Sequence, residues 1–177
     1  MSPGSPPVPP ATFRHLSLAD GVRAAMHRAP DKIAYRHGAE TRSYRQLLDR
    51  VDRVTALLLA GLGLEPGMHG AIIGKNSIAY MEIVLGASQA GIPLATVNPR
   101  LSLAEAVAIC DDAGARVVFA DAESAAALRD SPPADKPRII AIGPELEEAL
   151  GSARPPAAVP TVREWDDFTI PYTSGTT

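Results

Sequence analysis

Short apolar runs alternate with helix-like segments through most of this 177-residue chain, and this alternation restricts the possible folds more than any other feature. The runs occupy residues 69–74, 92–98, 116–121 and 138–143, and the helix-like segments occupy residues 77–91, 102–114, 123–130 and 144–151. Continuous apolar runs of this length, separated by helices, are typical of parallel strands that are buried on both faces. The sequence therefore predicts an α/β fold with a doubly wound, mostly parallel sheet flanked by helices.

Two further helices and a hairpin are predicted before residue 69. Ser17 with Asp20, and Ser43 with Gln46, have the spacing of a capping box, which marks the first turn of a helix. Ser102 with Glu105 has the same spacing at the start of the helix-like segment 102–114. Residues 32–44 alternate around a turn at Gly38, as expected of a short hairpin. Apolar side chains are spaced to share one face of each helix: Leu18, Val22 and Met26 in the first, and Tyr44, Leu47, Leu48, Val51, Val54 and Leu58 in the second.

Composition divides the chain into four regions. Residues 1–11 are rich in proline and are expected to form a disordered leader, and residues 12–152 form the predicted α/β lobe. Residues 153–164 are a proline-rich connector. Residues 165–177 are expected to hold the last strand, buried and parallel to the others, followed by the start of a phosphate-binding loop that stops at Thr177.

Charge and cysteine content argue against several classes of protein. The net charge of −3 comes from mixed signs and provides no basic face for nucleic acid. Cys110 is the only cysteine, which excludes an internal disulfide and a multi-cysteine metal site, and its place in an apolar segment predicts burial. The four histidines lack metal-ligand spacing, so we expect no metal ligand in this chain. Without a signal peptide or an apolar run long enough to span a bilayer, the protein is expected to be cytoplasmic.

Two glycine-bearing stretches resemble nucleotide-binding loops but fail on spacing. Residues 61–67 follow a helix instead of a strand, so a helix C-terminus followed by a turn is the better interpretation. The Gly-Lys pair at residues 74–75 suggests a Walker loop, but His69 stands where the first glycine is needed and Asn76 where a Ser or Thr is needed. Asn76 or Ser77 is instead predicted to cap the following helix.

The third stretch, YTSGTT at residues 172–177, follows a predicted strand. Successive backbone N–H groups in such a loop can form a concave anion site, and Gly175 would let a ligand approach the backbone closely. From composition alone, an ordinary Ser/Thr turn remains an open alternative. Lys75, Asn98 and Arg100 also follow predicted strand ends, where they could contact a ligand or cap a helix.

The order of these segments, together with four stretches of sequence, resembles the N-terminal portion of adenylate-forming acyl-CoA synthetases, the family that also contains firefly luciferase and the adenylation domains of peptide synthetases. The stretches are residues 42–67 (RSYRQLLDRVDRVTALLLAGLGLEPG), 69–102 (HGAIIGKNSIAYMEIVLGASQAGIPLATVNPRLS), 105–119 (EAVAICDDAGARVVF) and 172–177 (YTSGTT). The last matches the start of the family's most specific motif, which continues Gly-x-Pro-Lys-Gly. The likeness covers nearly the whole chain beyond the proline-rich leader.

The resemblance implies a two-step reaction that uses ATP, Mg²⁺ and coenzyme A. The carboxylate of an acid, expected to be a fatty or an aromatic acid, attacks the α-phosphate of ATP and forms an acyl-adenylate and pyrophosphate. The thiol of coenzyme A then displaces AMP to form a thioester. By this resemblance, the residues that would contact the ATP phosphates are Thr173, Ser174, Gly175, Thr176 and Thr177.

The family's other site residues have no counterpart in these 177 residues, including the lysine of the motif, the adenine and ribose contacts and the C-terminal catalytic lysine. We therefore expect an N-terminal fragment of an acid–CoA ligase that has no catalytic residue, is inactive alone and binds none of the cofactors tightly. Apolar surface left uncovered is expected to cause self-association. The alternatives are a non-catalytic α/β binding or interaction module derived from such an enzyme, and an unrelated flavodoxin-like or nucleotide-binding protein, which the failed glycine motifs disfavour.

Overall fold

A parallel sheet of five strands forms the centre of the computed structural model, which describes residues 17–155 and 158–172. The strands are β3 (His69–Ile73), β4 (Leu94–Val97), β5 (Ala115–Ala120), β6 (Arg138–Ala141) and β7 (Thr169–Pro171). Their order across the sheet is β6-β5-β3-β4-β7, and every neighbouring pair is parallel. The predicted fold class is confirmed.

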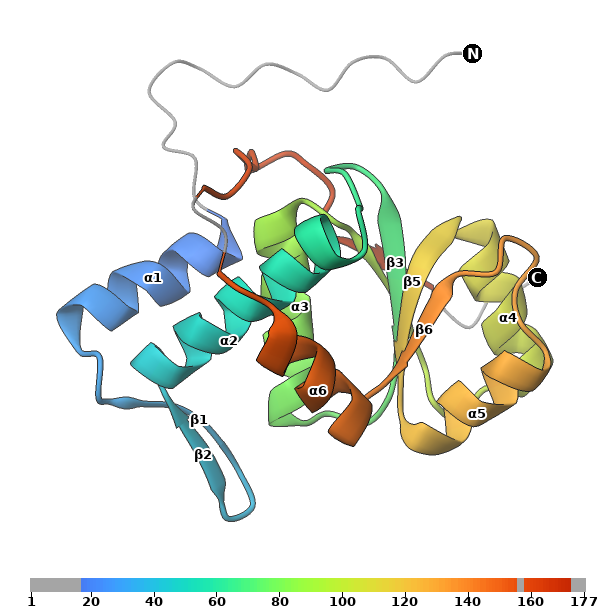
Figure 1. Cartoon of the computed structure of the whole chain (residues 1–177), viewed down its shortest axis with the longest axis horizontal. Coiled ribbons are helices and arrows are strands. Elements are labelled where there is room, and N and C mark those ends of the chain that lie inside the picture. Colours follow the sequence, from blue (N-terminus) through green and yellow to red (C-terminus); the bar gives the residue numbers. More distant parts are fainter. Residues whose placement is uncertain (1–16, 156–157, 173–177) are drawn as a thin grey trace.

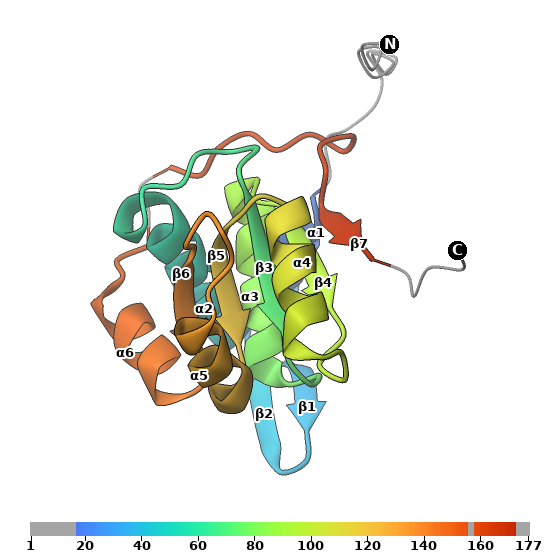
Figure 2. The ribbon, with the colours of Figure 1, turned by 90° about the vertical axis from the view of Figure 1, so that its right-hand side faces the viewer.

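Helices cover both faces of this sheet, as Figures 1 and 2 show. The helices are α1 (Leu18–Arg28), α2 (Tyr44–Ala56) with its extension η1 (Leu57–Gly61), α3 (Ile78–Ala90), α4 (Leu103–Asp112), α5 (Ala122–Asp130) and α6 (Pro144–Ser152). In Figure 1, α2, α3 and α6 lie on one side of the sheet, and α4 and α5 lie on the other. In the part of the chain that the structure describes, none of these helices is long and apolar enough to cross a membrane.

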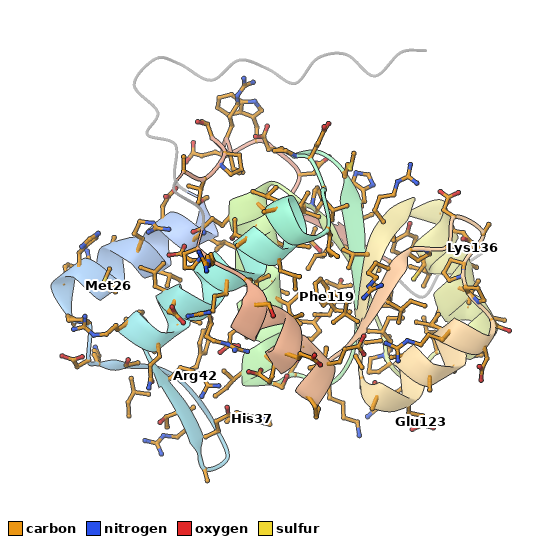
Figure 3. All side chains as sticks on the ribbon, in the orientation of Figure 1. Met26, His37, Arg42, Phe119, Glu123 and Lys136 are labelled. Atoms are coloured by element: carbon orange, nitrogen blue, oxygen red, sulfur yellow. The ribbon has the colours of Figure 1, made fainter. Side chains whose placement is uncertain are left out.

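Successive residues of each strand pack into two separate cores, because side chains alternate between the two faces of a sheet. Ile72 of β3 and Phe119 of β5 lie in the core formed with α2, α3 and α6, and Figure 3 shows Phe119 near the middle of the molecule. Ile73 and Val118 lie in the core formed with α4 and α5. Burial on both faces explains why these strands consist of continuous apolar runs.

Helix α1 and the hairpin that follows it pack against α2 and α3 and form a smaller third core with them. Strands β1 (Ile33–His37) and β2 (Glu40–Ser43) form the predicted hairpin, and the two capping boxes predicted for this region are present. The expected apolar face of the first helix is only partly buried. Leu18 is 52% exposed, whereas Ala19 is buried with Leu47. The small Ala19 lets α1 approach its neighbours, and larger side chains of α1 border an open groove beside the hairpin.

A buried carboxylate connects the hairpin with α2 and α3. Glu82 of α3 is 1% exposed and forms ion pairs with Arg42 of β2 at 3.0 Å and with Arg50 of α2 at 2.7 Å. Arg42 is labelled beside the hairpin in Figure 3, and Arg50 also pairs with Glu147 of α6. Because a buried charge is tolerated only when it is paired, this network holds the three helices in one arrangement.

The last strand differs from the prediction in its burial. β7 is parallel to its neighbour, as predicted, but within the described residues it pairs only with β4 and lies at the edge of the sheet (Figure 2). Its residues are half-buried or exposed instead of buried. A strand is fully buried only when neighbours and helices surround it, and the residues of the strand itself do not reveal how many neighbours it has.

Candidate functional site

The connections that follow the strands leave the sheet in different directions around β3. Helix α3, which follows β3, packs on one face, whereas α4 and α5, which follow β4 and β5, pack on the other. In open α/β sheets such a change of direction opens a crevice at the carboxyl ends of the strands, and ligands bind there. The topology therefore puts the candidate site beside the carboxyl end of β3.

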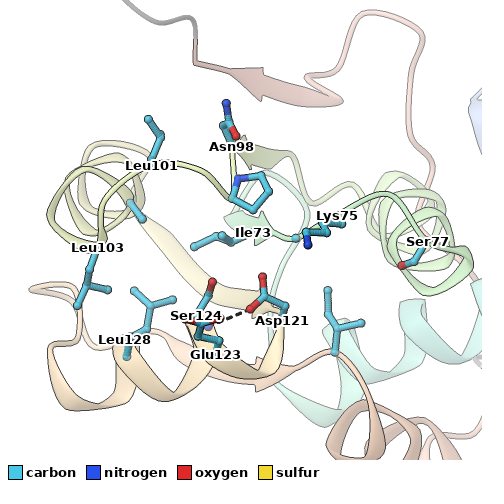
Figure 4. Close-up of a pocket in the computed structure, with 15 residues that line it drawn as sticks. Ile73, Lys75, Ser77, Asn98, Leu101, Leu103, Asp121, Glu123, Ser124 and Leu128 are labelled. Atoms are coloured by element: carbon cyan, nitrogen blue, oxygen red, sulfur yellow. Dashed lines mark hydrogen bonds between the residues drawn. The ribbon is translucent and has the colours of Figure 1, made fainter.

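A cavity of about 560 Å³ lies at this position, and Figure 4 shows it in close-up. This volume is within the usual range for sites that bind small molecules. Four of the loops that follow strands, together with α4 and α5, supply the lining: Ile73, Gly74, Lys75, Ser77, Asn98, Pro99, Leu101, Leu103, Ala106, Asp121, Glu123, Ser124, Ala127, Leu128 and Ile142. The cavity thus combines an apolar wall from α4 and α5 with polar groups from the strand ends.

Three polar side chains stand within two residues of a strand end and line this cavity. Lys75 follows β3, Asn98 follows β4 and Asp121 follows β5, and Figure 4 shows the three around one opening. Asp121 is held at two points. Its backbone N–H donates to the carbonyl of Ile73 at 3.0 Å, and its Oδ1 accepts the N–H of Ser124 at 3.0 Å. Capping of α5 thus fixes the position of this carboxylate.

The N-termini of α3 and α5 also border the cavity. Ser77 caps α3, and its Oγ accepts the backbone N–H of Tyr80 at 3.1 Å. Helix N-termini carry partial positive charge and favour anions, and Lys75 adds an exposed ammonium group on the same side. The β3–α3 side therefore suits an anionic ligand, whereas Asp121 and Glu123 on the α5 side suit a cation or a hydrogen-bond donor.

The residues predicted to follow strand ends have different roles in the structure. Lys75 and Asn98 line the cavity, whereas Arg100 lies outside its lining and donates its backbone N–H to Oδ1 of Asn98 at 3.0 Å. Ser77, and not Asn76, is the cap of the next helix. At residues 61–67 the predicted helix end and turn are confirmed, since η1 ends at residue 61 and the glycines at 63 and 67 have positive φ.

Asp121 is a cavity residue that the sequence analysis missed. It comes directly after the apolar residues of β5 and directly before α5. A hydrogen-bonding side chain at the junction of a buried parallel strand and a helix is a recognisable signal for both an N-cap and a ligand-facing position.

The described part of the chain ends at the same edge of the sheet. Pro171 of β7 is in register with Thr96 of β4, so Tyr172 follows at the carboxyl edge. The hydroxyl of Tyr172 donates a hydrogen bond of 2.7 Å to Asp112, the last residue of α4. Burial, and then the Asp112 carboxylate, raise the pKa of Tyr172 to about 12. The predicted phosphate contacts lie outside the described residues: Thr173, Ser174, Gly175, Thr176 and Thr177.

Other reactive side chains contribute little to this cavity. Among the described residues, no group of three His, Cys, Asp or Glu side chains is arranged to hold a metal ion. Cys110 is buried on α4, as predicted, and burial raises the pKa of its thiol to about 11. The described lining is therefore suited to holding a ligand by charge and hydrogen bonds.

Sequence comparison relates the chain to enzymes that activate carboxylic acids. A family model described as AMP-binding enzyme matches residues 22–177. A fatty acid–[acyl-carrier-protein] ligase, ScoC of Streptomyces coeruleorubidus, is 36% identical over 103 residues, which are 58% of this chain and 20% of that protein. The 4-hydroxybenzoate–CoA/benzoate–CoA ligase of Rhodopseudomonas palustris is 33% identical over 155 residues, which are 82% of this chain and 28% of that protein.

Comparison of structures leads to the same group of proteins. The N-terminal domain of FACL13 from Mycobacterium tuberculosis matches with a TM-score of 0.82 and 25% identity, over 90% of this chain and 42% of that one. The chain spans less than a third of the length of the two curated relatives. The family model and the structural match therefore each cover most of this chain. The same matches cover less than half of each relative.

Proposed function

The chain belongs to the AMP-binding enzyme family, and from this premise we propose that it is the N-terminal portion of an ATP-dependent carboxylic acid–CoA ligase. Such an enzyme uses ATP with Mg²⁺, a carboxylic acid and coenzyme A. Two of the relatives are named for a fatty acid and for benzoates. We infer a fatty or an aromatic acid as the substrate class.

Residues 173–177 bind the triphosphate of ATP in this proposal. Their hydroxyl and backbone N–H groups donate hydrogen bonds to phosphate oxygens, and Gly175 has no side chain to keep the phosphates at a distance. An oxygen of the acid's carboxylate forms a bond to the α-phosphorus as the bond to pyrophosphate breaks. Donors aimed at the pyrophosphate oxygens stabilise the charge that develops there, and Mg²⁺ neutralises part of it. The thiol of coenzyme A then forms a bond to the acyl carbon, and AMP leaves.

The parallel pairing of β7 with β4 is the observation that carries the proposal. It brings Tyr172, which directly precedes the Thr/Ser/Gly segment, to the edge at which Lys75 and Asn98 line the cavity. The N-terminus of α3 and the ammonium group of Lys75 border this edge, and both favour a polyanion such as a triphosphate.

We also propose that these 177 residues do not adenylate an acid by themselves and bind the cofactors only weakly. The support is the share of the relatives that the chain spans, which is 20% for ScoC and 28% for the benzoate–CoA ligase. An adenylating site of this family is therefore expected to need residues beyond those in this sequence.

ATP–pyrophosphate exchange tests this proposal. The assay is run with a panel of fatty and aromatic acids, on this chain and on any longer product of the same coding sequence. We expect acid-dependent exchange by the longer product and none by the 177 residues alone. Exchange by the 177 residues would overturn the proposed inactivity. If neither protein exchanges or binds ATP, the ligase proposal is wrong and a non-catalytic binding module takes its place.

A matched pair of glycine variants sharpens the test. Gly175→Ala in the longer product should lower exchange by roughly a hundredfold, because a methyl group at the point of close approach displaces hydrogen-bond donors from the phosphates. Gly151→Ala is the control, since a Cβ at this position in α6 meets nothing within 4 Å. Equal loss of exchange in both variants would point to a general effect on folding.

A further inference from the structure

We propose that the ion pair between Arg129 and Glu145 is a clasp that closes the outer edge of β6 and keeps a second copy of this chain from adding a strand there. The clasp consists of these two side chains, which also bind backbone groups of β6. This role is independent of the proposed ligase activity, because the pair lies outside the lining of the cavity beside β3.

Strand β6 lies at the end of the sheet. In the described part of the chain it pairs with β5 alone. Ile142, directly after the strand, donates its N–H to the carbonyl of Ala120 on β5. Because the backbone groups of a strand point alternately to one side and the other, Ile139 and Ala141 direct theirs away from β5. Outward groups of this kind are a template for pairing with another strand.

The clasp binds an outward carbonyl and an outward N–H of β6. Nη2 of Arg129 donates to the carbonyl of Ile139 at 3.2 Å, and Oε2 of Glu145 accepts the N–H of Ala141 at 3.1 Å. The same Nη2 donates to both carboxylate oxygens of Glu145, at 2.8 Å and 2.6 Å. One residue of a parallel neighbouring strand would bind these two groups of β6 through its own N–H and its own carbonyl. The joined side chains therefore occupy the hydrogen-bonding positions of a further strand.

Two helices on opposite faces of the sheet hold the clasp. Arg129 is in the last turn of α5 and Glu145 is in the first turn of α6. Figure 1 shows these helices on either side of β6. The helix dipole favours a cation near a C-terminus and an anion near an N-terminus, so both charges stand where their helices stabilise them. The clasp thus crosses the edge from one face of the sheet to the other.

The surroundings of the clasp indicate that it protects the edge and adds little to stability. The side chains of Arg129 and Glu145 are 45% and 38% exposed, and ion pairs this open to solvent contribute little to stability. A cavity of about 700 Å³ borders the strand here, and its lining includes Lys136, Arg138 and Ile139. The edge can therefore be approached from solvent. The exposed charges of Lys136 and Arg138 add repulsion against a copy that presents the same edge.

A second copy is the partner that the edge would accept once the clasp is removed. Two identical edges can pair antiparallel about a twofold axis, because each then supplies the donors and acceptors that the other needs. Such pairing would join two five-stranded sheets into one.

Hydrogen exchange followed by NMR on the 177-residue chain tests whether the clasp holds the edge. Glu145→Ala removes the acceptor of the Ala141 amide. In dilute protein this amide should exchange about tenfold faster than in wild type, the effect of losing a hydrogen bond to a charged group. The melting temperature should change little, because the pair is exposed. Equal exchange of this amide in the two proteins would overturn the proposal.

Sedimentation velocity at rising protein concentration tests what the open edge accepts. Glu145→Ala should associate at a concentration roughly tenfold lower than wild type. As it associates, the Ala141 amide should become protected again, because the added strand supplies a new acceptor. Association that leaves this amide unprotected, or that is no stronger than in wild type, would contradict the inference.

Matched variants separate closure of the edge from general stability. Glu145→Gln keeps an oxygen that can accept the Ala141 N–H and should stay close to wild type in both experiments. Arg129→Met frees the carbonyl that the guanidinium binds and should associate as Glu145→Ala does. Combining Arg129→Met with Glu145→Ala should add little, because both open one clasp.

An ion pair elsewhere on the surface provides the control. Asp31→Ala breaks the exposed pair with Arg45, which joins two side chains and involves no strand backbone. This variant should change neither the exchange of the Ala141 amide nor the association. If Asp31→Ala associates as strongly as Glu145→Ala, loss of a surface charge is the cause and the proposed clasp is refuted.

Discussion

The hydroxyl of Tyr172 lies 2.7 Å from a carboxylate oxygen of Asp112, a residue 60 positions earlier in the chain. The contact joins the carboxyl end of the edge strand β7 to the end of α4. Partial burial of the phenol raises its pKa, and the adjacent negative charge raises it further, because both disfavour the phenolate. This relationship makes the stability of the fold depend on pH in alkaline solution.

Stability should fall at high pH as Tyr172 loses its proton. The pKa of this group is about 12 in the folded chain and 10.0 ordinarily, so the folded state favours the protonated form. Its contribution is complete below pH 10 and is lost as the pH rises toward 12. The difference in unfolding free energy between wild type and Tyr172→Phe should narrow over this range in urea titrations. A constant difference would mean that the hydrogen bond does not govern this titration.

Removing the buried charge of Glu82 should destabilise the fold strongly. Glu82→Ala leaves the guanidinium groups of Arg42 and Arg50 without their shared partner, and breaking a buried ion pair in this way costs about 3–5 kcal/mol. Urea unfolding measures the loss. The exposed Glu148 on α6 is the control, and Glu148→Ala should remain within about 0.5 kcal/mol of wild type. A small loss for Glu82→Ala would show that the arginines find other partners.

A methyl group at Gly86 should separate α2 from α3. A Cβ at this position would lie 2.4 Å from Cβ of Val54, so Gly86→Ala forces the helices apart and should cost about 1–3 kcal/mol. Gly21→Ala in α1 is the matched control, because its Cβ meets nothing within 4 Å. There the better helix propensity of alanine should stabilise the protein by up to about 1 kcal/mol. Thermal unfolding should show a lower melting temperature for Gly86→Ala than for wild type and a higher one for Gly21→Ala.

The steric origin of the Gly86 effect can be checked with a second substitution. Val54→Gly removes the two atoms nearest to the added Cβ, Cβ at 2.4 Å and Cγ1 at 2.5 Å, and part of the cost of Gly86→Ala should disappear in this background. Simple addition of the two losses would mean that the helices do not respond to this contact.

Exposed apolar side chains predict self-association of the 177-residue chain. Leu18, which lines the groove of α1, is 52% exposed, Ile33 of β1 is 47% exposed, and Phe168 before β7 is 38% exposed. We expect sedimentation velocity at tens of micromolar to show dimers or larger species. Ile33→Thr should reduce association, whereas the matched Val159→Thr on the connector should not. A monodisperse monomer would contradict this prediction.

Features that depend on near neighbours in the sequence could be predicted. Residues 116–121 are predicted to form a buried strand because four consecutive residues among them are apolar, and β5 covers nearly the same residues. The capping boxes at Ser17, Ser43 and Ser102 each depend on one partner three residues away, and all three are predicted from the sequence and present in the structure. Periodicity also identified the buried stripe of α2.

Features that join distant residues could not be predicted in the same way. Nothing in the residues around Glu82 indicates that two arginines from other elements will neutralise it. The exposure of Leu18 depends on how α1 rests on α2 and α3, which the spacing of its apolar residues does not specify. These outcomes follow from packing between elements.

The sequence by itself determined the alternation of strands and helices and most of their ends, because each depends on residues within one turn or one strand. Only the tertiary structure decided that Lys75, Asn98 and Asp121 line one cavity and that Tyr172 meets Asp112 at the edge of the sheet. The physical reason is that burial of apolar surface across the whole chain sets the strand order and the placement of the helices. A pattern of neighbouring residues in the sequence does not specify that burial.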